Sequence, residues 1–423
     1  MAKYPQQIVE DLSLRFNEPS WRLQQRKEAL EQMETLALPS YERMPIDNLE
    51  LTKVDVTPHF VESSNIYNFT DMTPDKLLIV QEEEETIIEQ MPTALSEQGV
   101  ILTDLMTAFT EHSDLVRKYF MSVIKANDHQ LAAYNSAFLT SGIFLYVPKN
   151  VTIKEPIESL FMQSANAHSS FVKHVLIVAE ENSELTYIEH LASADTICQS
   201  RTGNMIVEVV AKVGAKVQYA AIDESAKQMN LFLERKAHLA KDATVDFAIG
   251  SMNKGTVVAD FDVELIGDGA SSNQHVVAIS TEDQKQFINT QVNHYGKFSK
   301  GDIMQRGVVL KNGDLRFNGI GHIYPEGKNA QTTQESRLLM LTDKGRGDAN
   351  PMLLIDHDEV VASHAASVGQ LDVETLFYLM SRGLSEEQVL RLQTYAFLNP
   401  VMKAMPNKEI QDELFVHLER ALD

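Results

Sequence analysis

The sequence contains a single cysteine, Cys198, among its 423 residues. One thiol cannot form an intrachain disulfide, and it cannot supply the several thiolates of a cysteine metal centre. Apolar runs are short, and none approaches the roughly 18 residues of a membrane-spanning helix. The first residues, MAKYPQQIVEDLSLRF, lack the apolar core of a secretory signal. We therefore expect a soluble protein of the cytoplasm, without a membrane partner.

Positive charge is scarce as well. The chain has 37 Lys and Arg residues against 60 Asp and Glu residues, which gives a net charge of −23. Nucleic-acid binding depends on clustered basic residues, so this balance argues against a nucleic-acid partner. The Walker motif, GxSxG, HExxH and CxxC are all missing, so no motif points to an enzyme.

Residues 1–145 are predicted to form a mostly helical N-terminal domain. Residues 21–36 and 102–127 have apolar side chains at helical spacing, and residues 77–80 (LLIV) are typical of a short strand. The acidic run at residues 82–85 follows directly. We expect this run to be solvated, because four like charges repel one another.

From residue 146 to 369 the sequence consists of short runs rich in Val, Ile, Thr and Phe, which are typical of half-buried strands. The turns between them share one plan, in which a small or turn-forming pair precedes alternating polar and apolar residues and an aromatic one. These turns begin at residues 181, 213, 241, 267 and 311, and we interpret the last step as two coils. At roughly 24 residues a coil, the pattern predicts a parallel β-helix of about nine coils.

A β-sandwich or barrel would need many tight hairpins. Two-residue hairpin signals occur, for example at residues 268–269 and 312–313, but they are too few for the number of strands. The end coils of a β-helix expose unpaired backbone, which must be capped or paired with another chain. The core is therefore predicted to be a scaffold with a docking end.

Residues 370–423 are predicted to form a C-terminal helical domain. Gly383 ends its first helix as a left-handed cap, Ser385 opens a second helix that ends before Pro400, and Asn407 caps a third. The sequence leaves open whether these helices cover the end of the core or form a partner-binding face.

Carboxylates and histidines are the remaining candidates for chemistry. Asp260, Asp262 and Glu264 alternate along one strand and share a face, for which we favour a solvated outer surface over a cation site. Three histidines fall near strand starts on different coils and could stack, although a structural or exposed role is favoured: His275, His294 and His322. Cys198 has no basic neighbour before Arg201, so it is predicted to be a buried or bystander thiol.

His364 lies in VVASHAASV (360–368), a small-residue strand in the last predicted coil. A neutral imidazole at an open edge can ligate iron or zinc, or move a proton. A lone histidine is nevertheless more often structural, so both interpretations stay open at this point.

Several stretches resemble the SufB/SufD family of iron–sulfur cluster assembly scaffold proteins, over most of the chain. The stretches are NSAFLTSGIFLYVP (135–148), EPI (155–157), FNG (317–319), AQTTQ (330–334), RLLML (337–341), PMLLI (351–355), DEV (358–360), SH (363–364), VGQLD (368–372) and LFYLMSRG (376–383). The SHAASVG form of the last-coil motif resembles the SufD branch. Glu335 fits that branch too, because it stands where SufB carries a cysteine proposed as a cluster ligand.

This resemblance implies a right-handed parallel β-helix between two helical parts and a non-catalytic role. It implies pairing with SufB through the β-helix edge near Val360, Ser363 and His364. It also implies binding of the ATPase SufC by the C-terminal helices, at Leu376, Phe377, Tyr378, Arg382 and Gly383. The isolated chain is expected to be able to form a homodimer.

The resemblance further implies that His364 faces SufB and helps to hold a transient iron–sulfur cluster, with no firmly bound cofactor. The sequence departs from the best-known SufD form at two positions. Ala362 replaces a cysteine and Ala365 replaces a glycine. Alanine cannot bind iron, so no ligand beyond His364 is implied.

Two other interpretations compete with this one. Parallel β-helices also occur as polysaccharide-active enzymes, but the expected secretory signal and basic groove are missing, and a charge of −23 would repel an acidic substrate. The second alternative is a homo-oligomeric structural β-solenoid with no other partner.

Overall fold

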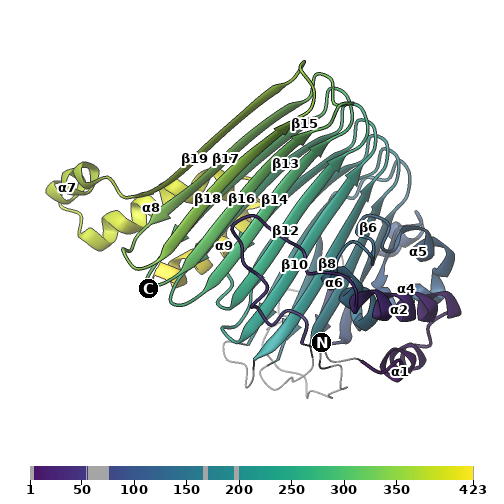
Figure 1. Ribbon diagram of the computed structural model, residues 1–423. Coiled ribbons are helices and arrows are strands. Elements are labelled where there is room, and N and C mark those ends of the chain that lie inside the picture. Colours follow the sequence, from purple (N-terminus) through teal and green to yellow (C-terminus); the bar gives the residue numbers. More distant parts are fainter. Residues whose placement is uncertain (1–3, 54, 56–75, 165–169, 195–199, 423) are drawn as a thin grey trace.

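The computed structural model describes residues 4–53, 55, 76–164, 170–194 and 200–422, so Cys198 lies outside the described residues. Two long sheets face each other, and helices lie toward both ends of the chain (Figure 1). Neighbouring strands of a sheet are alternate strands of the sequence, because the chain passes from one sheet to the other in every turn. This is the parallel β-solenoid that the turn pattern predicts.

The two sheets share one plan of stacked parallel strands, with antiparallel strands only at the N-terminal end. The first sheet stacks β5 (Ile157–Gln163), β7 (Glu184–Ser193), β9 (Lys216–Glu224), β11 (Thr244–Ser251), β13 (Ser271–Ser280), β15 (Lys300–Val309), β17 (Gln331–Met340) and β19 (Val361–Gln370). The second sheet stacks β4 (Ser141–Val147), β6 (Phe171–Ala179), β8 (Arg201–Ala211), β10 (Met229–Leu239), β12 (Thr256–Leu265), β14 (Lys285–His294), β16 (Asp314–Ile323) and β18 (Arg346–Ile355).

Strand pairing fixes the length of each turn. From β4 to β18 the register advances by 32, 32, 28, 26, 29, 29 and 32 residues, which makes seven turns. The prediction of about nine coils of about 24 residues is therefore wrong. The turn at residue 311 lies between β15 and β16, at the opposite corner from the other four. Its step of 44 residues covers a turn and a half, so a local motif that recurs at both corners misled the count.

The recurring turn motif has a backbone cause. Asn182, Gly214, Asp242 and Gly269 occupy the same corner of four successive turns, and their φ angles lie between 56° and 74°. Glycine, asparagine and aspartate tolerate this left-handed conformation best, which explains the small or turn-forming pair in each repeat.

The aromatic residue that ends the motif packs inside the solenoid. The rings of Tyr187, Tyr219 and Phe247 lie on successive turns, with centroids 5.3 and 5.2 Å apart. Apolar side chains from both sheets fill the space around this stack along almost the whole solenoid. Each turn therefore buries the apolar face of its neighbours, as the periodic pattern requires.

Six helices and three strands precede the solenoid in the described part of the chain. They are α1 (Gln7–Arg15), α2 (Ser20–Met33), β1 (Leu77–Glu82), β2 (Glu85–Gln90), α3 (Thr93–Ser96), β3 (Ile101–Asp104), α4 (Leu105–Glu111), α5 (Ser113–Tyr119) and α6 (Gln130–Phe138). The helix predicted over 21–36 is confirmed as α2, and the strand over 77–80 as β1. The stretch predicted as helical from residue 102 begins instead with β3, and Asp104 then caps α4.

Helix α2 is fixed to the end of α6 by a buried arginine. The Arg26 guanidinium donates to the Glu18 carboxylate at 2.6 and 2.8 Å and to the backbone carbonyls of Ala137 and Leu139 at 2.8 and 2.7 Å. Both charged side chains are fully buried. Burial raises the pKa of Glu18, but the neighbouring arginines outweigh it and lower the pKa overall, so the Glu18 carboxylate stays charged.

The acidic run at residues 82–85 is predicted to be solvated, and this prediction is wrong for residues 82–84. Glu83 accepts hydrogen bonds from Arg201 and from the backbone amide of Ser164, both at 2.7 Å. Glu84 pairs with Arg15 at 2.6 Å, and only Glu85 is exposed. The repulsion between neighbouring carboxylates is offset here by arginines that are distant in the sequence.

Three helices follow the solenoid: α7 (Val373–Ser381), α8 (Glu386–Met402) and α9 (Lys408–Leu422). The predicted caps are confirmed, because Gly383 has a φ of 99°, Ser385 forms a capping box, and Asn407 accepts from the Ile410 amide at 2.9 Å. Helix α8 does not end before Pro400. The proline lies within its last turn, where only one backbone hydrogen bond is lost.

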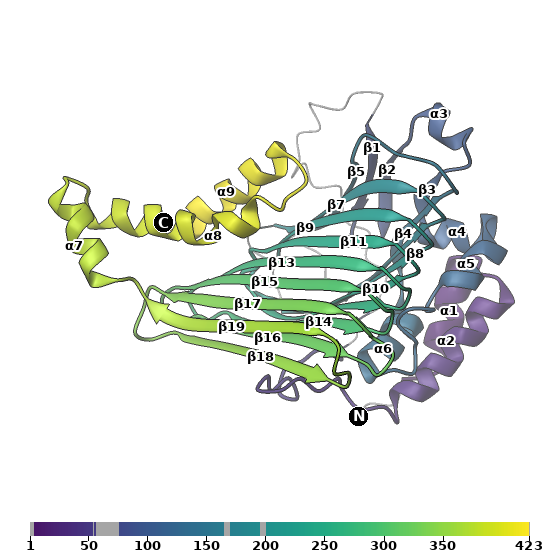
Figure 2. The same cartoon turned by 90° about the horizontal axis from the view of Figure 1, so that it is seen from above.

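The C-terminal helices do not close the end of the solenoid. Figure 2 shows α8 and α9 beside the first sheet, and α7 furthest from it. Apolar side chains of α8 and α9 pack on that sheet around a cluster that contains Ala220, Ala248, Val277, Leu398 and Leu414. Among the described helices, none combines the length and apolar character needed to cross a bilayer.

Candidate functional site

The solenoid has an open end at its last turn. Within the described residues, β18 pairs only with β16 in the second sheet, and β19 pairs only with β17 in the first. The other end carries antiparallel strands, with β2 paired to β1 and β3 to β4. The last turn is therefore where another chain could continue both sheets.

The backbone of β19 is oriented for such pairing. The Val361 amide donates to the carbonyl of Ala330 at 3.0 Å, and the register with β17 then continues without a shift. Along a parallel strand, residues that bond to one neighbour alternate with residues whose backbone groups point away from it. Ala362, His364, Ala366 and Val368 therefore present their amides and carbonyls outward, where an added strand could bond to them.

Apolar side chains accompany this exposed backbone. Val361 and Val368 of β19 are 66% and 46% exposed, and Leu354 of β18 is 46% exposed. Every residue of β19 except Ala362 is exposed, whereas every residue of β8 in the middle of the stack is buried. Exposed apolar side chains at the unpaired end of a sheet are typical of an interaction face. We call β18 and β19 together the open edge.

Three predicted residues lie at the open edge. His364 and Ser363 are exposed on β19, opposite Gln334 and Thr333 in register, and Val360 directly precedes the strand. His364 makes no hydrogen bond or ion pair with another described residue. Within the described part of the chain, no three His, Cys, Asp or Glu side chains are grouped for a metal ion. His364 could thus offer one imidazole, and any further ligands would have to come from a partner.

Glu335 lies on β17, one strand inward from β19, and its carboxylate already has two partners. Its carboxylate accepts from Arg306 at 2.6 Å and pairs with Arg337 as well. The Arg306 guanidinium also lies 5.7 Å from the ring centroid of Phe397 on α8. At the position that the family resemblance compares with a SufB cysteine, this chain therefore has a carboxylate neutralised by two arginines.

Helix α7 is the second exposed feature near this end. None of its residues is buried, and Phe377 and Tyr378 are 75% and 53% exposed. Arg382 donates to the Tyr378 hydroxyl at 3.1 Å, and its guanidinium lies 5.1 Å from the ring centroid. Leu376 is half-buried, and Gly383 ends the helix. The residues predicted to face SufC therefore form an apolar and aromatic surface that projects away from the solenoid.

The acidic row on β12 shares a face as predicted, but it is not a solvated surface. Asp260 accepts from the Tyr41 hydroxyl at 2.9 Å and from Asn289 at 2.8 Å. Burial raises the pKa of Asp260 to about 7, and the nearby carboxylates add to this shift. Asp262 and Glu264 share Lys236, at 3.0 and 2.8 Å. Hydrogen-bond donors and a lysine occupy the row, so it serves packing.

The three histidines that could stack do not. His275 is on β13 in the first sheet, whereas His294 and His322 are on β14 and β16 in the second. His294 is opposite Ile323 in register, and His322 is opposite Asn293. His322 stacks instead on Tyr324, with ring centroids 3.9 Å apart.

Sequence reasoning missed an ionic cluster that fastens α9 to the first sheet. His417 lies 3.3 Å from Glu224 of β9 and 3.7 Å from Glu413, which in turn contacts His190 of β7 at 3.2 Å. Burial lowers the pKa of His417, but hydrogen bonds to the two glutamates outweigh it and raise the pKa to about 9. The spacing of Glu413 and His417, four apart on a helix, was the available signal.

Comparison with known proteins gives a consistent result across the chain. Residues 161–397 match the family model described as "SUF system FeS cluster assembly, SufBD core domain". Residues 18–158 match the model described as "SufBD protein N-terminal region". The first match covers more than half of the chain and includes the open edge, α7 and most of α8.

Curated relatives agree with these models. The chain is 37% identical to the iron–sulfur cluster assembly protein SufD of Bacillus subtilis, over 98% of this chain and 97% of that protein. It is 27% identical to iron–sulfur cluster assembly SufBD family proteins of Staphylococcus aureus and Staphylococcus epidermidis, over 94% of this chain and 89% of each relative. The similarity therefore extends over nearly the full length of all three proteins.

Proposed function

The chain belongs to the SufBD family of iron–sulfur cluster assembly proteins, and from this premise we propose that it is a non-catalytic scaffold subunit that pairs with SufB. The observation that carries the proposal is the open edge. Its outer strand combines outward-pointing backbone groups with exposed apolar side chains, and the chain's own helices leave it uncovered. A second parallel β-solenoid of the same family would present matching strands.

The exposed surface of α7 supports a second contact, with the ATPase SufC. Phe377 is the most exposed of its aromatic residues, and aromatic side chains together with arginine are typical of the energetic centre of interfaces. Tyr378 and Arg382 hold each other in place, so their geometry is preorganised before binding. SufC would reach α7 without touching the open edge, and both partners could bind together.

The iron–sulfur cluster is cargo in this proposal. His364 offers one imidazole at the open edge, so SufB would supply the other ligands of a transient cluster at the interface. Both proteins would work in the cytoplasm, whose reducing conditions suit a chain with one cysteine. The acidic row on β12 gives no support to the polysaccharide-enzyme alternative, because Lys236, Tyr41 and Asn289 occupy it.

The test is co-purification of this chain with SufB and SufC after substitution of Ala366→Pro. Ala366 presents its amide outward on an edge strand, so proline removes a hydrogen-bond donor needed only by the partner. We expect recovery of SufB to fall at least tenfold and recovery of SufC to stay unchanged. The matched variant Ala366→Thr keeps the amide and should retain both partners.

Two results would contradict the proposal. Wild-type recovery of SufB by Ala366→Pro would show that the open edge does not pair with it. Binding of a second copy of this chain in preference to SufB, measured by light scattering of the mixture, would favour the homo-oligomeric alternative. Circular dichroism of each variant confirms that the solenoid is intact.

A further inference from the structure

A pocket lies between α9 and the ends of strands in the first sheet, away from the open edge. It has a volume of about 330 Å³ and is bordered by α9 and by the turns that follow β9, β11, β13 and β15. This volume is near the lower end of the range of roughly 300–1,000 Å³ found for small-molecule sites. A ligand of this pocket would therefore be small.

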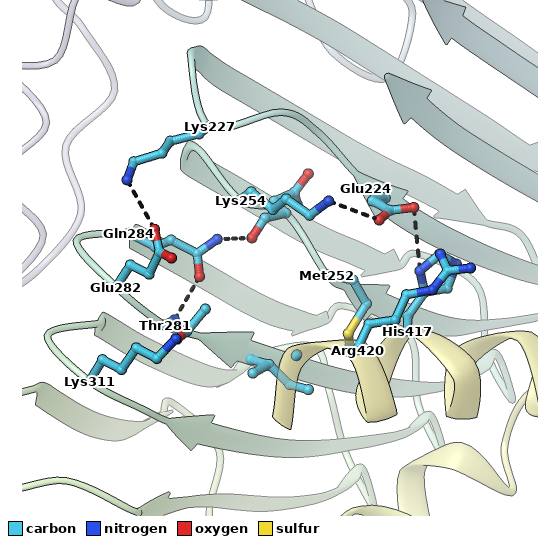
Figure 3. A pocket seen from close by; sticks show the side chains of 13 residues that line it. Glu224, Lys227, Met252, Lys254, Thr281, Glu282, Gln284, Lys311, His417 and Arg420 are labelled. Atoms are coloured by element: carbon cyan, nitrogen blue, oxygen red, sulfur yellow. Dashed lines mark hydrogen bonds and ion pairs between the residues drawn. The ribbon is translucent and has the colours of Figure 1, made fainter. Parts of the chain in front are cut away.

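The pocket is rich in positive charge although the chain has a net charge of −23. Lys227, Lys254, Lys311 and Arg420 border it, and His417 is a fifth cation because its pKa is raised to about 9. Only two carboxylates, Glu224 and Glu282, line the same space. Figure 3 shows Lys227, Glu282 and Lys311 toward one side and Glu224, His417 and Arg420 toward the other.

The two carboxylates already have cationic partners. Glu282 pairs with Lys227 at 2.9 Å, and Glu224 pairs with His417 at 3.3 Å and with Lys254 at 3.6 Å. Within the described residues, no hydrogen bond or ion pair holds the side chain of Lys311 or of Arg420. These two cations come from the turn after β15 and from the end of α9, and they give the pocket an excess of positive charge.

The inner surface of the pocket combines polar and apolar groups. Met252, Ile279 and Ala421 provide an apolar part. Beside them, the buried hydroxyl of Thr281 has no hydrogen-bond partner among the described residues, although a buried hydroxyl normally has one. The amide side chain of Gln284 is engaged by the Asn253 carbonyl and the Thr281 amide. The pocket thus combines an apolar surface with two cations that have no partner among the described residues.

We propose that this pocket binds a small phosphate-class dianion carried on a short apolar body. Arg420 would contact the anionic oxygens, because arginine is a side chain that commonly binds phosphate, and Lys311 on the other side of the pocket would add to its positive charge. Met252 and Ile279 would contact the apolar body. The proposal is independent of pairing with SufB, because none of these residues belongs to the open edge.

Phenyl phosphate is the probe, and its binding to the full chain is measured by isothermal titration calorimetry. We expect the double variant Lys311→Met/Arg420→Met to lose at least tenfold in affinity. The matched control is Lys216→Met on β9, a lysine 65% exposed that pairs with Glu184 outside the pocket. This control should bind within twofold of the unmodified chain. Thermal unfolding of each variant separates loss of binding from loss of folding.

Three companion ligands make the chemistry specific. Inorganic phosphate should bind at least fivefold more weakly than phenyl phosphate, because it lacks the apolar body. Benzoate should also bind more weakly, because it carries a single negative charge, and phenol should not bind. Equal affinity of phenyl phosphate for the folded double variant, or no binding to the unmodified chain, would overturn the proposal. Equal binding of benzoate would overturn its assignment to the phosphate class.

Discussion

The two ends of the solenoid solve the same physical problem in different ways. At the N-terminal end, the chain adds the antiparallel strands β2 and β3 and packs helices α1–α6 nearby. At the C-terminal end, no further strand of the described residues pairs with β18 or β19, and α8 and α9 fold back along the first sheet. A stacked fold must cover its end strands, so this contrast indicates that the covering of the last turn comes from another chain.

The difference between the ends also appears in where charged groups are buried. Near the N-terminal end, Arg26 and Glu18 are completely buried and hydrogen-bonded, and Glu83 is buried against Arg201. Near the open edge, Arg337 remains half exposed, and Arg382 projects into solvent. Substitutions at the two ends should therefore act on different quantities, folding stability at one and partner binding at the other.

The largest expected effect on folding stability is that of a substitution at the N-terminal end. Arg26→Met removes the donors to Glu18 and to two buried carbonyls, and leaves a buried carboxylate with much weaker pairing. We expect the free energy of unfolding to fall by about 3–5 kcal/mol in urea titrations. Arg382→Met on α7 is the matched control, with a change of less than about 0.5 kcal/mol. Equal losses in both variants would contradict the proposed difference between the ends.

A smaller, pH-dependent effect on the free energy of unfolding is expected for a substitution of His417. This residue lies between the two ends of the solenoid, where α9 contacts the first sheet. His417 faces Glu224 and Glu413, with His190 and Arg420 nearby. Its pKa is about 6.5 in the unfolded chain and about 9 in the folded chain. The resulting stabilisation is complete below about pH 6.5 and is lost as the pH rises through 9. His417→Gln should lower the free energy of unfolding by about 2 kcal/mol at pH 6 and leave it almost unchanged above pH 9.5.

The control for this variant is Val416→Gln, which places the same side chain on an exposed position of α9. Its free energy of unfolding should stay within about 0.5 kcal/mol of the unmodified chain at every pH. A loss for His417→Gln that is the same at pH 6 and pH 9.5 would show that packing, and not the protonated imidazole, accounts for it.

Substitution of an exposed aromatic residue on α7 should affect binding without affecting folding. Phe377→Asp is expected to change the free energy of unfolding by less than about 0.5 kcal/mol. Its affinity for SufC, measured by surface plasmon resonance, should fall more than tenfold because an interface aromatic residue is lost. Leu14→Asp on α1, where the leucine is 82% exposed, is the counterpart at the N-terminal end and should bind SufC normally.

The smallest effect on stability is expected for His364→Ala. The side chain is exposed and makes no hydrogen bond within the described chain, so folding and pairing with SufB should be retained. Iron and acid-labile sulfide bound per complex after anaerobic reconstitution should decrease, because one proposed ligand is lost. Ser363→Ala is the control. An unchanged cluster yield would leave His364 without a role as a ligand.

The sequence predicted the architecture because its signals are local. A left-handed residue at Asn182, Gly214 and Asp242, followed by an aromatic residue five positions later, repeats once per turn and requires no knowledge of distant contacts. The number of turns was wrong for the same reason. Lys311 also has a positive φ, so a turn at the opposite corner looks the same in the sequence.

The environment of charged residues could not be predicted in this way. Tyr41 is 219 residues from Asp260, and Arg201 is 118 residues from Glu83, so neither pairing leaves a local pattern. The helix α7 could be predicted from its apolar spacing, but its exposure could not. Helical spacing does not show whether an apolar face packs on the chain's own core or is left exposed. The roles of His364 and of the residues on α7 remain predictions, supported by their position at the uncovered end.

The contacts of α9 have a consequence for how this fold can vary. Glu413 reaches His190 on β7, and His417 reaches Glu224 on the adjacent strand β9. Four helical residues rise about 6 Å, which is close to the strand spacing of about 4.8 Å. An extra coil inserted between these strands would double that spacing and separate one of the pairs. Related chains that gain or lose a coil should therefore do so outside the stretch that α9 spans.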